Sequence, residues 1–218
     1  QNGKLSKAEK YAINFTKEFP KHPFGWTILG AIMEQTSRNS EALNANHNRV
    51  LLSPQDAEAH FNLGNILQKL ERLDESELSY MKAISLNPYY AEAYNNLGNL
   101  QRKLERLDES ETSLKQAIAL KPDYFEPHYN LAIMLQDLKR FDESISYLKK
   151  VIKINPHFIN NRISLNAVSN SVVPGWHIPM MNDKARNNAY FEAIKLAVDD
   201  GAFVLDIGTG SGLLALMA

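Results

Sequence analysis

The residues with the clearest chemical pattern lie near the end of the sequence, in residues 203–212. An apolar run ends at an aspartate, and three glycines follow at alternate positions. Glycines let a turn approach a bound ligand closely, and a carboxylate at a strand end accepts hydrogen bonds from hydroxyl or amino groups. The sequence therefore predicts a nucleotide-type cofactor site at the junction of a strand and a helix. Its candidate residues are Asp206, Gly208, Gly210 and Gly212.

The glycine pattern favours one cofactor class over another. Dinucleotide-binding folds favour G-x-G-x-x-G, with a pyrophosphate at the helix N-terminus, but Leu213 stands at the third glycine position. The carboxylate of Asp206 would also lie close to any bound phosphate and repel it, which argues further against a dinucleotide. The run Val-Leu-Asp-Ile-Gly-Thr-Gly-Ser-Gly resembles the start of a class I methyltransferase core. That resemblance implies S-adenosylmethionine as the cofactor and a methyl transfer without a metal.

Residues 176–190 narrow the resemblance. They are similar to the segment His-x-x-Met-(Leu)-x-Asp-x-x-Arg-x-x-x-Tyr that precedes the glycine motif in protein arginine methyltransferases. His177 is followed by Met180 after three residues and by Arg186 after nine, as in that family. The resemblance implies that Arg186 pairs with the cofactor carboxylate, for which a guanidinium fork is suited. It also implies that Met180 packs near the cofactor and that His177 lines its pocket.

The second domain departs from the family in two respects. The Tyr-Phe-x-x-Tyr segment that usually precedes the histidine is replaced by residues 172–176. The two catalytic glutamates that the resemblance implies would lie beyond residue 218, so the catalytic residues stay unknown. We therefore expect only the start of an α/β, Rossmann-like methyltransferase domain, and we expect this fragment to be inactive by itself.

The preceding sequence is built from repeats. Prolines recur every 34 residues, at Pro20, Pro54, Pro88, Pro122 and Pro156. Two motifs recur with the same period, one of the type Asn-Asn-Leu-Gly-Asn and one of the type Arg-Leu-Asp-Glu-Ser. The pattern resembles the tetratricopeptide repeat, a helix–turn–helix unit of about 34 residues. The resemblance implies a mainly α-helical solenoid.

The repeats predict the domain organisation. We expect repeats over 1–156, a linker over 157–175 and the methyltransferase fragment over 176–218. The repeats comprise a half unit and four whole units, at 8–20, 23–54, 57–88, 91–122 and 125–156. The unit 23–54 is degenerate, because Asn46 and Arg49 stand where apolar residues are expected. The chain begins at Gln1 within a helical pattern, so we expect the natural N-terminus to be missing.

Within each unit, apolar residues at helical spacing predict one buried stripe per helix. In the unit 57–88 the stripe of the first helix comprises Leu63, Ile66, Leu67 and Leu70. That of the second helix comprises Leu78, Met81 and Ile84. Asp74 and Asp108, each followed three residues later by a glutamate, are expected to cap the second helices. Small residues are expected where paired helices approach closely, among them Gly64, Gly98 and Ala132.

Solenoids of this kind present a concave face, built from the first helix of each unit, that usually holds a peptide or protein. Asparagines recur there at Asn62, Asn96 and Asn130, with Asn65 and Asn99 one turn on. A carboxamide both donates and accepts, so these residues are either a ladder that binds a peptide backbone or merely solvated. They resemble the asparagine ladder of the O-GlcNAc transferase repeats. Acidic residues at the second position of each unit argue against a clamp for a chain's carboxyl terminus.

Composition excludes several classes of function. The chain has 24 Lys and Arg against 25 Asp and Glu without a basic block, which argues against nucleic-acid binding. It has no cysteine, which excludes disulfides and thiolate metal sites and fits a reducing compartment. No apolar stretch approaches the roughly 18 residues of a membrane span. We therefore expect a cytoplasmic protein without metal, nucleic-acid or membrane partners, whose oligomeric state is not predicted.

Three functions follow from these patterns. The first is a methyltransferase that modifies an arginine of a protein recruited by the repeats. The second is an interaction adaptor with a degenerate methyltransferase-like domain, although the intact glycine motif argues against it. The third is a methyltransferase with a different acceptor, because a fold does not determine a substrate.

Overall fold

The computed structural model describes the backbone of residues 2–156 and the side chains of residues 5–156. Within this range the chain is entirely helical, which confirms the predicted solenoid. The helices are α1 (Asn2–Glu18), α2 (Pro23–Gln35), α3 (Asn39–Leu52), α4 (Ala57–Lys69), α5 (Leu73–Leu86), α6 (Ala91–Lys103), α7 (Leu107–Leu120), α8 (Phe125–Asp137) and α9 (Phe141–Ile154). The linker predicted at 157–175 and the methyltransferase fragment predicted at 176–218 lie outside the described residues.

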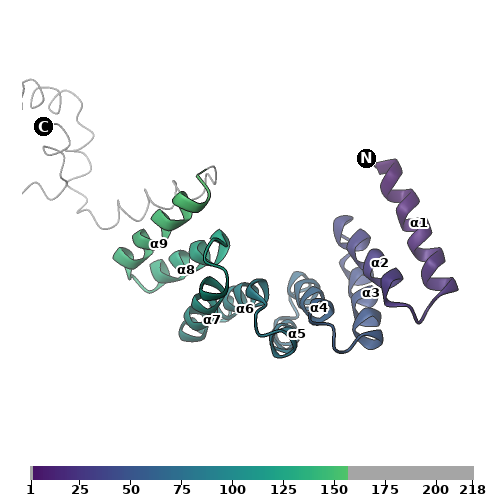
Figure 1. The fold of residues 1–218 in the computed structure, drawn as a ribbon, viewed down its shortest axis with the longest axis horizontal. Helices are drawn as coiled ribbons and strands as arrows, with labels where there is room; N and C mark the ends of the chain where they lie inside the picture. The colour runs from purple at the N-terminus through teal and green to yellow at the C-terminus, as the bar shows by residue number, and fades with distance from the viewer. Residues whose placement is uncertain (1, 157–218) are drawn as a thin grey trace, which may run out of the picture.

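Helices α2 to α9 form four successive pairs that stack along an arc, and α1 packs on α2 at one end of it (Figure 1). Each second helix packs on the first helix of its own pair and on the first helix of the next pair. Helices α4 and α6 lie toward the open side of the arc, and α5 and α7 lie on its outside (Figure 1). The middle of the concave face is therefore built from first helices.

A left-handed residue ends each first helix. The positive φ angles belong to Ser37, Glu71, Glu105 and Lys139, which share one position in the four units. At Glu71 the backbone N–H bonds Gln68 O, and the next N–H, of Arg72, bonds Leu67 O at 3.0 Å. These two bonds form a Schellman motif without its usual glycine. Backbone hydrogen bonds therefore form the turn between paired helices. The sequence does not reveal this turn, because none of the four positions holds a glycine.

This turn explains why the predicted caps of the second helices are wrong. Helices α5 and α7 begin at Leu73 and Leu107, so Asp74 and Asp108 are already helical residues. Both N-cap positions hold an arginine that makes no side-chain cap. The acids still lie in the first turn, where they interact favourably with the helix dipole.

The predicted apolar stripe of α5 is also only partly right. Leu78 and Met81 are 67% and 53% exposed, whereas Ser76, Tyr80 and Ala83 are buried against the neighbouring helices. The buried stripe thus contains a serine and a tyrosine. The apolar residues alone therefore predict the wrong face of α5 as the buried one. In α4 the predicted residues Leu63, Ile66 and Leu67 are buried as expected, while Leu70 is the C-cap.

A serine fastens the two helices of each regular pair. Ser76, Ser110 and Ser144 each donate to a main-chain oxygen 12 residues earlier, at distances of 2.8, 2.7 and 2.9 Å. The acceptors are Gly64, Gly98 and Ala132, the small residues predicted at the close approach. A small residue leaves its carbonyl oxygen accessible to the partner helix. The serine of the second helix and the glycine or alanine of the first helix therefore form one contact between them.

The degenerate pair, α2 and α3, buries polar residues in place of apolar ones. Asn46 is 4% exposed and donates to Ala42 O at 3.0 Å. Arg49 is 5% exposed and bonds Asp56 at 2.8 Å. Asp56 also caps α4 by accepting from the backbone N–H of Glu58 at 2.9 Å. The polar residues are therefore paired inside the solenoid rather than exposed to solvent.

Candidate functional site

The residues predicted to hold the cofactor lie outside the described residues, so the geometry of that site stays a prediction. They are His177, Met180, Arg186, Asp206, Gly208, Gly210 and Gly212. The candidate site that the structure describes is the predicted peptide-binding face of the repeats.

The structure brings two of the predicted asparagines into contact. Asn65 lies on α4 and Asn96 on α6, and Asn96 Nδ2 donates to Asn65 Oδ1 at 2.8 Å. Both side chains stay partly exposed. This contact joins successive units, so the carboxamides are oriented by each other as well as by their helices.

Asn130 on α8 bonds a residue at a different repeat position. Its Nδ2 donates to Asn95 Oδ1 at 2.9 Å, whereas the repeat equivalent of the Asn96–Asn65 contact would join it to Asn99. Asn95 is 5% exposed. Sequence reasoning missed this residue because the matching positions of the neighbouring units hold Phe61 and Tyr129, so no repeat signals it.

The remaining two asparagines have no comparable partner. Asn62 and Asn99 are partly exposed, and within the described residues neither side chain makes a hydrogen bond. The five predicted asparagines are thus not linked to one another in a continuous series. One contact joins α4 and α6, another joins α6 and α8, and two carboxamides have no side-chain partner in the described part of the chain. Peptide binding by these residues stays a prediction.

A depression of about 350 Å³ surrounds the first of these contacts. We call it the inner-face pocket. It spans α2, α4 and α6, and its lining consists of Glu34, Asn65, Gln68, Lys69 and Asn96. Lys69 and Glu34 form an ion pair of 3.0 Å within it.

A buried tyrosine orients the floor of this pocket. The hydroxyl of Tyr80 lies 2.8 Å from Asn65 Oδ1 and 2.9 Å from Gln68 Oε1. Burial raises the pKa of Tyr80 to about 12, so the hydroxyl stays protonated at neutral pH. The single hydroxyl hydrogen is shared between the two amide oxygens, and Asn65 Oδ1 also accepts from Asn96 Nδ2. Neither Asn65 Nδ2 nor Gln68 Nε2 makes a hydrogen bond within the described residues, so both are available as donors. The arrangement is suited to carbonyl oxygens of a ligand.

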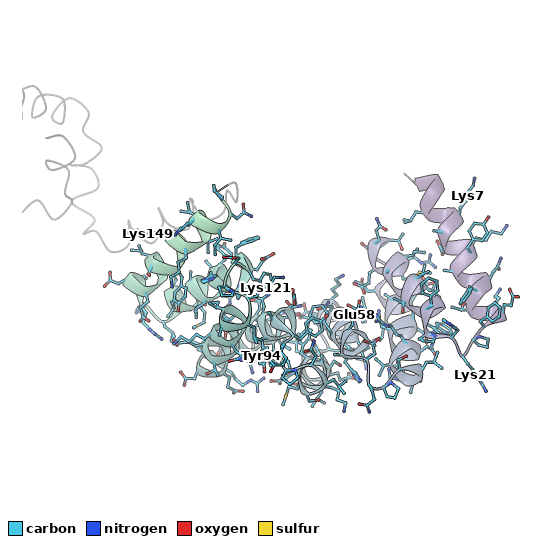
Figure 2. All side chains as sticks on the ribbon, viewed as in Figure 1. Lys7, Lys21, Glu58, Tyr94, Lys121 and Lys149 are labelled. Carbon is cyan, nitrogen blue, oxygen red and sulfur yellow. The ribbon has the colours of Figure 1, made fainter. Side chains whose placement is uncertain are left out.

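Two of the acidic residues at the second position of the units, Glu58 and Glu92, form ion pairs. Glu58 and Lys121 are marked in Figure 2 on the middle part of the arc. Glu58 pairs with Arg49 at 3.2 Å, and Glu92 pairs with Lys121 at 3.0 Å. Glu92 and Glu58 thus place negative charge where a carboxylate clamp would need positive charge.

Known solved structures share this fold. The crystal structure of MamA is 21% identical, with a TM-score of 0.66 over 71% of this chain and 91% of that chain. The crystal structure of YrrB is 18% identical, with a TM-score of 0.63 over 76% of this chain and 84% of that chain. At these identities the likeness establishes the fold alone. Within the described residues, no helix is both long and apolar enough to cross a membrane.

Short segments of the chain match curated arginine methyltransferases. One is 54% identical over 46 residues to an arginine N(omega)-methyltransferase of Streptomyces achromogenes subsp. streptozoticus. Another is 46% identical over 52 residues to protein arginine N-methyltransferase 9 of Xenopus laevis. These matches cover 21% and 23% of this chain, but only 13% and 6% of the relatives, so the chain spans a small part of their length.

The repeat pattern matches a known family directly. The tetratricopeptide repeat family matches at residues 57–90, 91–124 and 125–158. These stretches contain the helix pairs α4 and α5, α6 and α7, and α8 and α9. The chain therefore contains tetratricopeptide repeats, stacked as a helical solenoid.

Proposed function

We propose that this chain belongs to an S-adenosylmethionine-dependent protein arginine methyltransferase whose repeats recruit the protein to be methylated. The short matches to arginine methyltransferases support the reaction. The spacing of His177, Met180 and Arg186 ahead of the Asp206 glycine motif supports the same assignment. In this proposal Arg186 holds the cofactor carboxylate, and Asp206 with Gly208 holds the methionyl end.

The observation that carries the recruiting role is the inner-face pocket. Its donors Asn65 Nδ2 and Gln68 Nε2, which make no hydrogen bond within residues 5–156, are suited to the carbonyl oxygens of an extended peptide, whatever its side chains. Two structural neighbours support a peptide ligand. YrrB is described as a repeat protein with an unusual peptide-binding site, and the first repeat domain of RPAP3 is bound to an HSP90 peptide.

The proposal is tested on the natural full-length protein with radiolabelled S-adenosylmethionine and a cell extract as the protein acceptor. Amino-acid analysis of the labelled proteins should yield methylarginine. Label on another residue would reject arginine as the acceptor, and an unlabelled extract would favour the adaptor function. Titration calorimetry should show that Arg186→Ala and Asp206→Ala abolish cofactor binding.

The recruiting role needs a separate measurement. Asn65→Ala combined with Asn96→Ala should raise KM for a protein acceptor and leave kcat and the KM for a short arginine peptide unchanged. Asn48→Ala, on the exposed part of α3 outside the pocket, is the matched control. An unchanged KM for the protein acceptor in the double variant would reject the inner-face pocket as the recruiting site.

A further inference from the structure

Arginines link the second helices of successive pairs. Arg106 pairs with Glu77 and Arg140 with Glu111, in each case across 29 residues. Arg38 pairs in the same way with Glu9. We call this series the arginine ladder. It bridges the outer face of the solenoid from one second helix to the next.

Each of these arginines holds a second carboxylate within its own helix. Arg140 bonds Glu143 at 2.6 Å while it also bonds Glu111 at 2.6 Å. Arg106 likewise lies 3.5 Å from Glu109. Each regular arginine of the ladder therefore binds two carboxylates, one from its own helix and one from the preceding second helix.

Arg72 is the exception. It bonds Glu75 in its own helix, at 2.7 and 2.6 Å, through Nε and one terminal nitrogen. The position that supplies the second carboxylate in the other units is Leu43 here. Within the described residues Arg72 thus holds one carboxylate instead of two, and its side chain is 45% exposed.

An apolar groove of about 510 Å³ lies at this break in the ladder. We call it the outer groove. It lies between α3 and α5 with α4 beneath it, and Arg72 is part of its lining. Leu63 and Leu67, which are 8% and 3% exposed, form its floor, and Leu78 forms a wall that is 67% exposed. A missing carboxylate and an uncovered apolar surface therefore occur side by side.

We propose that the outer groove binds a peptide segment in which an aspartate or glutamate lies next to a large apolar residue. The acidic side chain takes on Arg72 the place that Glu77 takes on Arg106. The neighbouring apolar side chain covers Leu78 and the floor of the groove.

The internal ladder provides the chemical argument for this ligand. Its regular members show that a guanidinium in this position accommodates a carboxylate from outside its own helix, beside the local glutamate. Among the described residues, Glu75, the local glutamate, is the one carboxylate in the lining of the outer groove, and it is paired with Arg72 as Glu143 is with Arg140. Burial of the ligand's apolar side chain against Leu63, Leu67 and Leu78 favours binding, because apolar surface is removed from water.

The test uses a random library of short displayed peptides, selected on the immobilised 218-residue chain. Leu43→Glu is the key variant, because it restores the carboxylate that the ladder lacks. Leu43 also lines the outer groove, so Leu43→Gln, which removes the same apolar side chain without adding a charge, is its matched control and should bind the peptides more tightly than Leu43→Glu. We expect the enriched peptides to share an acidic residue beside Leu, Ile, Met or Phe. They should bind Leu43→Glu at least about tenfold more weakly than the wild type.

Arg72→Gln is the second variant, which removes the charge without adding a ladder contact. It should weaken the same peptides about fivefold, the effect of a partly exposed ion pair. Asn96→Ala, in the inner-face pocket, should leave their affinity unchanged. This control keeps the outcome separate from that of the proposed recruiting site.

Three results would overturn the proposal. The first is that no selected peptide prefers the wild type to Leu43→Glu. The second is that the enriched peptides have no acidic residue in common. The third is that Arg72→Gln leaves their affinity unchanged. Sedimentation would identify a different occupant. If the wild type dimerised at concentrations where Leu43→Glu is monomeric, the groove would belong to a second copy of the chain.

Discussion

The ring of Tyr80 lies against the backbone of Gly64, so closely that a Cβ at Gly64 would be 2.6 Å from the Cε1 atom of the ring. Real Cβ atoms do not come so near to another heavy atom. The contact brings α4 and α5 together and places the Tyr80 hydroxyl under the inner-face pocket. Packing between paired helices and the orientation of the candidate site therefore depend on the same two residues.

Gly64→Ala should destabilise the protein, because the buried ring of Tyr80 cannot move away freely. Overpacking of this kind costs about 1–3 kcal/mol, which the higher helix propensity of alanine offsets by up to about 1 kcal/mol. Urea unfolding followed by circular dichroism measures the difference.

Tyr80→Leu is the matched background for this test, because the fourth unit combines Ala132 with Leu148 at the equivalent positions, both fully buried. Gly64→Ala should cost less in that background than in the wild type. Equal costs in the two backgrounds would show that the ring is not what restricts position 64.

The serine that fastens each pair should also contribute measurably. Ser110→Ala removes the 2.7 Å bond to Gly98 O within a buried interface. The expected loss is about 1 kcal/mol in the free energy of unfolding. Ser85→Ala is the control, since Ser85 makes a comparable bond to Lys82 O but is exposed. A shift of the same size in both variants would assign the effect to helix propensity instead.

The arginine ladder predicts how stability depends on pH. The hydrogen bond from Arg140, opposed by desolvation and aided by Lys115, holds the pKa of Glu111 below its ordinary value of 4.5. The ionised form is thus favoured in the folded state. Its contribution is fully present above pH 4.5 and is lost as the pH falls through the lowered pKa.

Glu111→Gln tests this dependence. At neutral pH the variant should be less stable than the wild type by about 1 kcal/mol or less, because the pair is partly exposed. The difference should shrink as the pH falls below 4.5, as unfolding measured at several pH values would reveal. A difference that stays constant with pH would mean that Glu111 acts through packing and not through its charge.

The contacts between asparagines of adjacent units could not be predicted from the sequence. The asparagines at equivalent positions predict one regular ladder, but Asn96 bonds Asn65 while Asn130 bonds Asn95. Asn95 offers Asn130 a different acceptor, whereas the equivalent position one unit earlier holds Phe61. A strict period of 34 residues does not reveal such an exception.

The helical solenoid and the small residues at the close approach follow from the sequence alone, since a helix-pair period and a lack of side-chain volume are local properties. The sequence is also the basis of the predicted cofactor motif at Asp206 and of the resemblance to arginine methyltransferases. Helix packing is what turns Leu78 outward, sets Tyr80 against the inner-face pocket and, within the described residues, leaves Arg72 with one carboxylate instead of two. These facts depend on which helices become neighbours, and the distance between residues of different units is a property of their packing rather than of their spacing along the chain.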